Sequence, residues 1–143
     1  MNLNILILFS LLLVHSYSVT RDKKLEKLQI GIKKRIADSE CKEKVEKSDT
    51  IEVHYRGLLY SNDEEFDSSY SRDKPLSVMV GSGSVIQGFD AGLMGMCVGE
   101  KRRVMIPSDM GYGPRGSPPK IPENADLIFE LELVSIKKPN QDL

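Results

Sequence analysis

The chain has 143 residues and a formal net charge of −1, so its overall charge gives no electrostatic reason to bind nucleic acid or anionic lipid. Its content of 40% hydrophobic and 29% charged residues is typical of a soluble globular protein and argues against wholesale disorder. No apolar run reaches the ~18–20 residues of a membrane span, so stable membrane insertion is not expected. We expect a single compact domain.

Residues 1–18 have the pattern of a secretory signal peptide. An apolar stretch over residues 5–14 is followed by the small residues Ser16 and Ser18, after which cleavage is expected. A buried apolar helix is the alternative, although no charged residue precedes Arg21. Removal of the signal peptide would leave a chain of ordinary single-domain size.

The chain contains two cysteines, Cys41 and Cys97, and neither belongs to a C-x-x-C pair. A zinc site would lack ligands, because His54 is the one histidine that remains after removal of the signal peptide. Two lone cysteines in an oxidising compartment most often pair, so we expect a disulfide between them. Two buried thiols remain the alternative.

The predicted elements are mostly strands. Residues 21–27 are rich in charge and predict a mobile lead-in. We place this charged lead-in, which precedes the domain, at 19–26. Leu28, Ile30 and Ile32 alternate with polar residues or glycine, which predicts a half-buried strand, whereas the mixed charges of residues 42–49 predict a solvated connection. Further strands are predicted at 50–57, 76–80, 101–106 and 127–136, and their alternation favours an antiparallel sheet with one covered face.

One short helix is predicted within this series of strands. Ser84 is a suitable N-cap, and Gln87 three residues later would complete a capping box. Phe89, Leu93 and Met96 have the spacing of an apolar stripe. Because glycines weaken this helix, it must be held by packing against the sheet.

A catalytic triad of serine, histidine and an acid would have to use His54. The alternating pattern places Val53 and Tyr55 on the buried face of the strand, so His54 is expected to point to solvent with Glu52 and Arg56. That orientation argues against nucleophilic catalysis of this kind.

The segment 107–126 is unusually long for a connection inside a compact domain. Five of its 20 residues are proline and three are glycine. Long loops of this kind are usually functional, and proline lowers the entropy that is lost on binding. We expect a lid or pocket wall, with an unspecialised surface loop as the alternative.

Five motifs occur in order along the chain: Val53-His54-Tyr55-Arg56-Gly57, Phe66-Asp67-Ser68-Ser69, Gly81 with Val85-Ile86-Gln87-Gly88-Phe89, Gly111-Tyr112-Gly113, and Leu127-Ile128-Phe129-Glu130-Leu131-Glu132-Leu133. Over residues 27–137 the sequence closely resembles the FKBP-type peptidyl-prolyl cis-trans isomerases, and among them the small single-domain members of the endoplasmic reticulum. The resemblance implies an α+β fold in which a five- to six-stranded antiparallel sheet wraps around one short helix.

The resemblance also implies a pocket that isomerises Xaa-Pro bonds without a nucleophile, metal or cofactor. In such a pocket Phe89 would be the floor, Ile86 and Tyr112 would donate hydrogen bonds to substrate carbonyls, and Asp67 would orient polar groups. Phe129 could instead simply fill the core. The implied catalytic residues are Tyr55, Phe66, Asp67, Ile86, Phe89, Tyr112 and Phe129, and the implied binding residues are Arg72, Leu76, Val85 and Ile121.

Two positions depart from the family pattern. Phe89 stands where the family usually has tryptophan, and Leu76 replaces an aromatic residue at the pocket edge. Weaker binding of tacrolimus- or rapamycin-type macrolides is therefore expected. A low-turnover module that binds proline-containing peptides, or a chaperone, is the main alternative to an enzyme, and a purely structural secreted domain is a third.

The resemblance implies proline-containing client polypeptides as partners, and we expect a monomer. The variable loop 117–121 is expected to tune the choice of partner. We expect localisation in the lumen of the endoplasmic reticulum, or secretion. The tail 138–143 ends in Asn140-Gln141-Asp142-Leu143, which distantly resembles a K/H-D-E-L retention signal.

Overall fold

The computed structural model describes residues 17–141, so the predicted signal peptide, except for its last two residues, lies outside the described part. The described residues form a six-stranded antiparallel sheet, one α-helix and three short 3-10 helices. The strands are β1 (Gln29–Lys34), β2 (Thr50–Leu59), β3 (Glu65–Ser68), β4 (Leu76–Met79), β5 (Lys101–Ile106) and β6 (Leu127–Lys137), and the helices are α1 (Gln87–Leu93), η1 (Tyr70–Arg72), η2 (Ser108–Met110) and η3 (Gly113–Arg115). The α+β fold expected from the sequence is confirmed.

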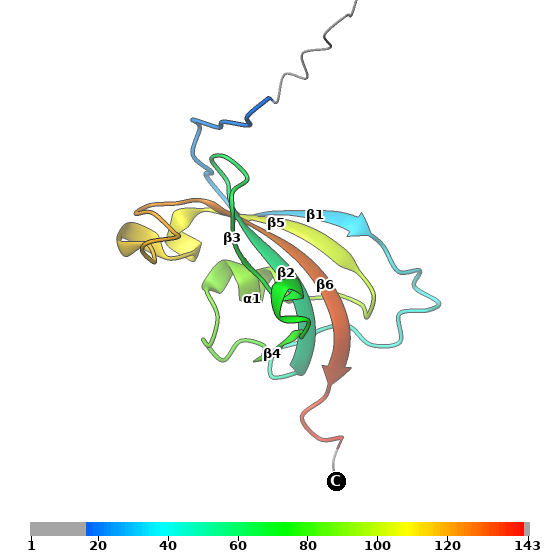
Figure 1. Ribbon diagram of the computed structural model, residues 1–143. Helices are drawn as coiled ribbons and strands as arrows, with labels where there is room; N and C mark the ends of the chain where they lie inside the picture. The colour runs from blue at the N-terminus through cyan, green and yellow to red at the C-terminus, as the bar shows by residue number, and fades with distance from the viewer. Residues whose placement is uncertain (1–16, 142–143) are drawn as a thin grey trace, which may run out of the picture.

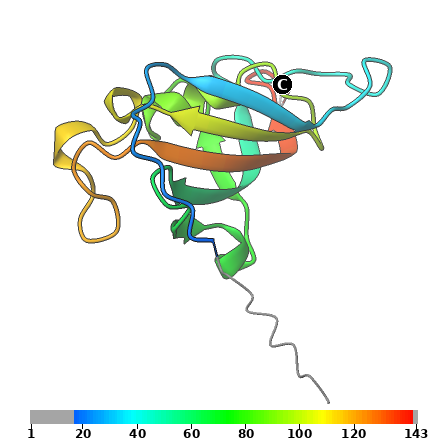
Figure 2. The same ribbon diagram turned by 90° about the horizontal axis from the view of Figure 1, so that it is seen from above.

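The strand order is β1-β5-β6-β2-β3, and β4 pairs with the other half of β2. The sheet curves past α1, which packs against one of its faces (Figure 1). Strand β6 lies in the middle and alternates as predicted: Leu131 and Leu133 are buried in the core, while Glu132 lies on the opposite face. The segment between β5 and β6 projects from one end of the sheet as η2, η3 and a loop (Figure 2).

Two glycines allow α1 to lie close to β5. A Cβ atom on Gly88 would stand 2.4 Å from Cγ2 of Ile106, and one on Gly92 would stand 2.8 Å from Cγ2 of Val104. Both distances are too short for a side chain, so the helix and the strand approach each other more closely than other residues would permit. The same glycines that weaken the isolated helix therefore allow it to be stabilised by packing against β5.

The predicted start of the helix was wrong. Helix α1 begins at Gln87, its N-cap is Ile86 with ψ of 149°, and no side chain caps it. Ser84 instead belongs to the loop before the helix, whose Gly81 N–H donates to the Asp90 carboxylate over 3.1 Å. Ile86 has a non-helical backbone, with φ of −58° and ψ of 149°, and both Val85 and Ile86 line the pocket.

Strand β1 and the connection 42–49 also differ from expectation. Strand β1 is an edge strand with all its residues exposed, since it pairs with β5 alone and no layer covers it. The connection 42–49 is not simply solvated, because Val45 and Asp49 are each 1% exposed and Lys138 Nζ donates to the Asp49 carboxylate over 2.8 Å.

The charged lead-in is bound to the rest of the domain and is not free. Arg21 donates to the Asp63 carboxylate over 2.8 Å and to the Tyr60 carbonyl over 2.7 Å. The Leu25 N–H donates to the Asp126 carboxylate over 2.7 Å. These contacts fasten the segment to the turn after β2 and to the start of β6.

The expected disulfide joins Cys41 to Cys97 across a sequence separation of 56 residues. It links the connection between β1 and β2 to the segment that follows α1. None of the helices in the described residues is both long and apolar enough to cross a lipid bilayer.

Candidate active site

A pocket of about 370 Å³ opens between α1, the sheet and the loop 107–126. Its side chains come from β2, β3, β4, β6, α1, the residues that lead into α1, and the loop. The lining residues are Tyr55, Phe66, Asp67, Leu76, Gly83, Ser84, Val85, Ile86, Phe89, Tyr112 and Phe129.

The base of the pocket is a cluster of four aromatic rings. The ring centroids of Phe89 and Phe129 are 5.1 Å apart with an interplanar angle of 85°, and those of Phe66 and Phe129 are 5.6 Å apart at 82°. Tyr55 meets Phe89 edge-on at 5.8 Å. Edge-to-face packing fixes each ring against its neighbours. Phe129 therefore both lines the pocket and belongs to the core, so the two interpretations of this residue are compatible.

Three polar side chains, Tyr55, Asp67 and Arg72, form a hydrogen-bonded group beside the aromatic rings. The Tyr55 hydroxyl donates to the Asp67 carboxylate over 2.5 Å, and Arg72 donates to the Tyr55 hydroxyl over 2.7 Å and to Asp67 over 2.8 Å. Burial alone would raise the pKa of Asp67, but hydrogen bonds from Tyr55, Arg72 and the Ser68 N–H outweigh it and lower the pKa. Burial, followed by the bond to Asp67, raises the pKa of Tyr55. At neutral pH the pair is thus a carboxylate and a protonated phenol.

Two residues that line the pocket carry hydrogen-bond donors without a protein partner in the described part of the chain. Among residues 17–141 nothing accepts a hydrogen bond from the Ile86 N–H or the Tyr112 hydroxyl. The pKa of Tyr112 is raised by burial and by the negative charge of Asp67, so its hydroxyl keeps its proton at neutral pH. Both groups are available to bind the carbonyl oxygens of a ligand.

Two predicted binding residues lie beside the pocket and do not line it. Arg72 acts on it through Tyr55 and Asp67, and its own side chain is half exposed. Ile121 is 5% exposed and lines a neighbouring hollow of about 380 Å³ with the loop residues 117–120. The two hollows share Phe66, Asp67 and Tyr112, so they adjoin each other. Gly83 and Ser84 were not expected in the pocket; they line it because the helix begins later than predicted.

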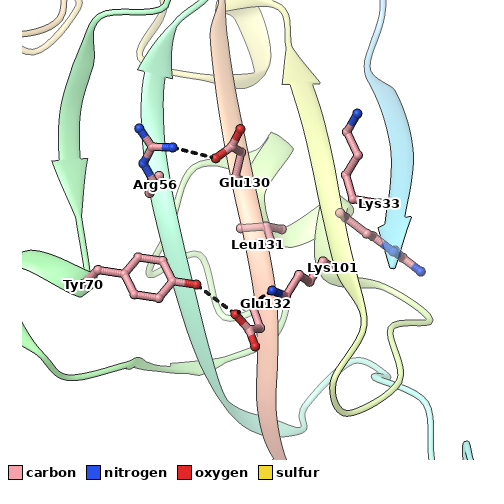
Figure 3. Close-up of a pocket in the computed structure, with 8 residues that line it drawn as sticks. Lys33, Arg56, Tyr70, Lys101, Glu130, Leu131 and Glu132 are labelled. Carbon is pink, nitrogen blue, oxygen red and sulfur yellow. Dashed lines mark hydrogen bonds and ion pairs between the residues drawn. The ribbon is translucent and has the colours of Figure 1, made fainter. Parts of the chain in front are cut away.

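A second hollow, of about 330 Å³, lies on the outer face of the sheet and is lined mainly by charged side chains (Figure 3). Both carboxylates of this hollow are already engaged: Glu130 binds Arg56 over 3.1 Å, and Glu132 accepts a hydrogen bond from the Tyr70 hydroxyl over 2.9 Å. Burial, followed by the bond to Glu132, raises the pKa of Tyr70 to about 12. A ligand here would have to compete with these contacts, so the aromatic pocket is the better candidate.

His54 lies on this outer face, as its strand position predicts, but it is only partly exposed. Its ring stacks on Tyr70 with centroids 4.6 Å apart, and its Nδ1 lies 2.9 Å from the Ser69 hydroxyl oxygen. It is therefore a structural contact of the sheet and does not enter the pocket.

Residues 41–134 match the model of the FKBP-type peptidyl-prolyl cis-trans isomerase family. The chain belongs to this family. The resemblance stated from the motifs, and the enzyme class that it implies, are thereby confirmed.

Similar proteins extend the match over nearly the whole chain. The chain is 45% identical to the mouse peptidyl-prolyl cis-trans isomerase FKBP2, in an alignment that covers 96% of each protein. It is 48% identical to the peptidyl-prolyl cis-trans isomerase FPR2 of Saccharomyces cerevisiae over 88% of this chain and 93% of that protein. It is also 46% identical to FK506-binding protein 2B of Rhizopus delemar over 96% of this chain, but spans only 65% of that longer relative.

Proposed function

We propose that the aromatic pocket binds an Xaa-Pro segment of a polypeptide and accelerates rotation about its amide bond. The observation that carries this proposal is the combination of an apolar ring cluster with two unpaired donors, Ile86 N–H and the Tyr112 hydroxyl. The proline ring would rest on Phe89, and the donors would bind the flanking carbonyls. The protein would act as a monomer on proline-containing client polypeptides.

The chemistry follows from the electronic structure of the amide. Resonance gives the C–N bond partial double-bond character, and the rotation barrier is ~18–20 kcal/mol. Uncatalysed exchange takes roughly tens to hundreds of seconds. The planar amide is more polar than the twisted transition state, because twisting breaks the resonance that separates charge. A pocket walled by apolar rings therefore disfavours the planar form relative to the twisted form.

The hydrogen-bonded group of Tyr55, Asp67 and Arg72 positions the pocket and takes no part in proton transfer. Asp67 stays ionised and receives hydrogen bonds from Tyr55 and Arg72, so it has no need to accept a proton from the substrate. The fixed donors can then favour the twisted geometry by hydrogen bonding. Each ~1.4 kcal/mol of selective stabilisation raises the rate tenfold.

Removal of the pocket floor tests this assignment. The Phe89→Ala variant should lose more than about tenfold in kcat/KM, because a truncated floor grips the proline ring less well. Tyr70→Ala is the matched control, since it removes an exposed ring from the opposite face. Exchange between cis and trans proline is measured by NMR on a proline-containing peptide. Equal rates for Phe89→Ala and the unaltered protein would overturn the assignment.

The main alternative is a module that holds proline-containing segments with little turnover. Phe89 and Leu76, which are smaller than the residues usual in the family, would favour it. The enzyme is favoured by the presence of the other implied catalytic residues: Tyr55, Asp67, Ile86, Tyr112 and Phe129. Peptide binding without accelerated exchange would support the module.

We further propose that the enzyme works in the secretory pathway, in the lumen of the endoplasmic reticulum. Residues 1–18 supply the signal-peptide pattern, and the disulfide between Cys41 and Cys97 suits an oxidising compartment. Expression in a eukaryotic secretory host, followed by N-terminal sequencing, tests the proposal. A first residue of Val19 is expected, and a retained Met1 on cytosolic protein would contradict it.

A further inference from the structure

Arg102 is a buried cation that does not line the aromatic pocket. It lies on β5 and is 9% exposed, and its ion-pair partner Glu100 is 5% exposed. No step of the proposed isomerisation uses either group. A buried charge is costly unless it is well paired and hydrogen-bonded, so the contacts of Arg102 indicate what it does.

The guanidinium of Arg102 binds the carboxyl-terminal end of α1. Its Nη1 atom donates to the Gly92 carbonyl over 3.0 Å and to the Met94 carbonyl over 2.7 Å, and its Nε atom donates to the Glu100 carboxylate. The last carbonyls of a helix lack partners within the helix and carry partial negative charge. Arg102 therefore satisfies and neutralises the end of this helix.

Glu100 completes the contact from the other side. Its second carboxylate oxygen accepts a hydrogen bond from the Cys97 N–H over 3.4 Å. The ion pair thus spans the backbone from Gly92 to Cys97, which is the chain that leaves α1. The helix has only seven residues and no side-chain cap at its start. The chain beyond it is also held by backbone hydrogen bonds of Gly95 and Met96 to Val45, but in the described part of the protein the side-chain bonds to the Gly92 and Met94 carbonyls come from Arg102.

Arg102 is one of three core-facing residues of β5 that contact the helix. Ile106 lies against Gly88 and Val104 lies against Gly92, each within 3 Å of where a Cβ would stand. These two apolar contacts set how closely the helix approaches the strand. They are non-directional, whereas a hydrogen bond requires a defined geometry. Arg102, by binding directed carbonyls, can set the position along the strand.

We infer that Arg102 is a positioning residue that holds α1, and hence Phe89, in register with the rest of the aromatic pocket. The inference rests on the proposed function, because it assigns Phe89 the role of the pocket floor. Phe89 is one helical turn from the Arg102 contact at Gly92, and its ring must meet both Tyr55 and Phe129 edge-on.

The test measures the position of residue 89 independently of activity. The sequence contains no tryptophan, so the Phe89→Trp variant places one fluorophore at the pocket floor. Adding Arg102→Met to this variant should red-shift the emission and raise the acrylamide quenching constant. Arg103→Met is the matched control, because Arg103 lies next along β5 and pairs with Glu130 on the outer face.

In the protein with Phe89 intact, Arg102→Met should lower kcat/KM about tenfold at temperatures where circular dichroism shows it folded. Arg103→Met should keep its kcat/KM. Should Arg102→Met fail to fold, Arg102→Lys serves instead: it keeps the positive charge and loses the planar fork, and it should give a smaller change in the same direction.

A folded Arg102 variant with unaltered quenching and kcat/KM would overturn the inference, even if it unfolds at lower urea. Absence of isomerase activity in the unaltered protein would contradict the proposed function alone. The fluorescence of residue 89 would still decide the role of Arg102.

Discussion

Asp67 shows how a charged side chain can border an apolar pocket without placing its charge in the reaction. Its carboxylate is occupied by Tyr55, Arg72 and the Ser68 N–H, which together lower its pKa against the opposing effect of burial. A carboxyl group whose pKa is lowered by folding stabilises the folded state at pH values above its ordinary pKa of 3.8. This stabilisation is lost as the pH falls through the lowered pKa.

We predict that Tyr55→Phe raises the pKa of Asp67 toward its ordinary value, because one of its hydrogen-bond donors is removed. Titration of the Asp67 carboxyl by ¹³C NMR measures this change. Tyr112→Phe is the control, since no hydrogen bond joins Tyr112 to Asp67 in the described part of the chain. An unchanged Asp67 pKa in Tyr55→Phe would contradict the assigned geometry.

Phe89 is the residue at which the pocket floor departs from the family pattern. We predict that Phe89→Trp strengthens rapamycin binding about fivefold, because an indole ring buries more apolar area than a phenyl ring. Isothermal titration calorimetry measures the affinity. Equal or weaker binding would show that the smaller ring does not limit macrolide affinity.

Residue roles could be predicted only where a motif carried them. The motif spacing placed Tyr55, Phe89 and Tyr112 around one site, and all three do line the pocket. Arg102 gave no such signal, because its neighbours in the sequence are also cations and only the fold reveals which one is buried. The position of Ile121 beside the pocket depends on how the loop 107–126 packs, which residue spacing cannot specify.

At the level of elements, the close contact between α1 and β5 depends on the absence of a side chain at Gly88. We predict that Gly88→Ala lowers the free energy of unfolding by about 1–3 kcal/mol, since the new methyl group would overlap Ile106. Urea denaturation measures the loss. Gly31→Ala on the exposed strand β1 is the control: its Cβ would meet nothing closer than 3.7 Å, and it should not lower stability. Equal effects of the two substitutions would contradict the packing.

An element could be predicted when its own sequence carries the pattern, and was missed when it forms only by pairing with another strand. Strand β6 was predicted to within one residue, because its alternation indicates a sheet with one buried face, and β5 was predicted with its correct bounds. Strand β3 was missed, since its four residues include a single large apolar side chain, Phe66, and it becomes a strand by pairing with β2. The exposure of β1 was likewise set by its edge position.

At the level of the whole molecule, the disulfide joins segments that the sheet alone does not hold together. We predict that the double substitution Cys41→Ala and Cys97→Ala lowers the free energy of unfolding by about 2–5 kcal/mol, because the unfolded chain loses a long closed loop. Urea denaturation of the oxidised protein and the double variant measures the difference. Equal stabilities would show that the bond adds nothing to the fold.

We propose that the aromatic pocket catalyses Xaa-Pro isomerisation. The most direct test is the exchange rate of an Ala-Leu-Pro-Phe peptide, measured with the purified protein in the presence and absence of rapamycin. We predict accelerated exchange that rapamycin abolishes. A folded protein that binds rapamycin and leaves the exchange rate unchanged would contradict the claim and leave a pocket that only binds.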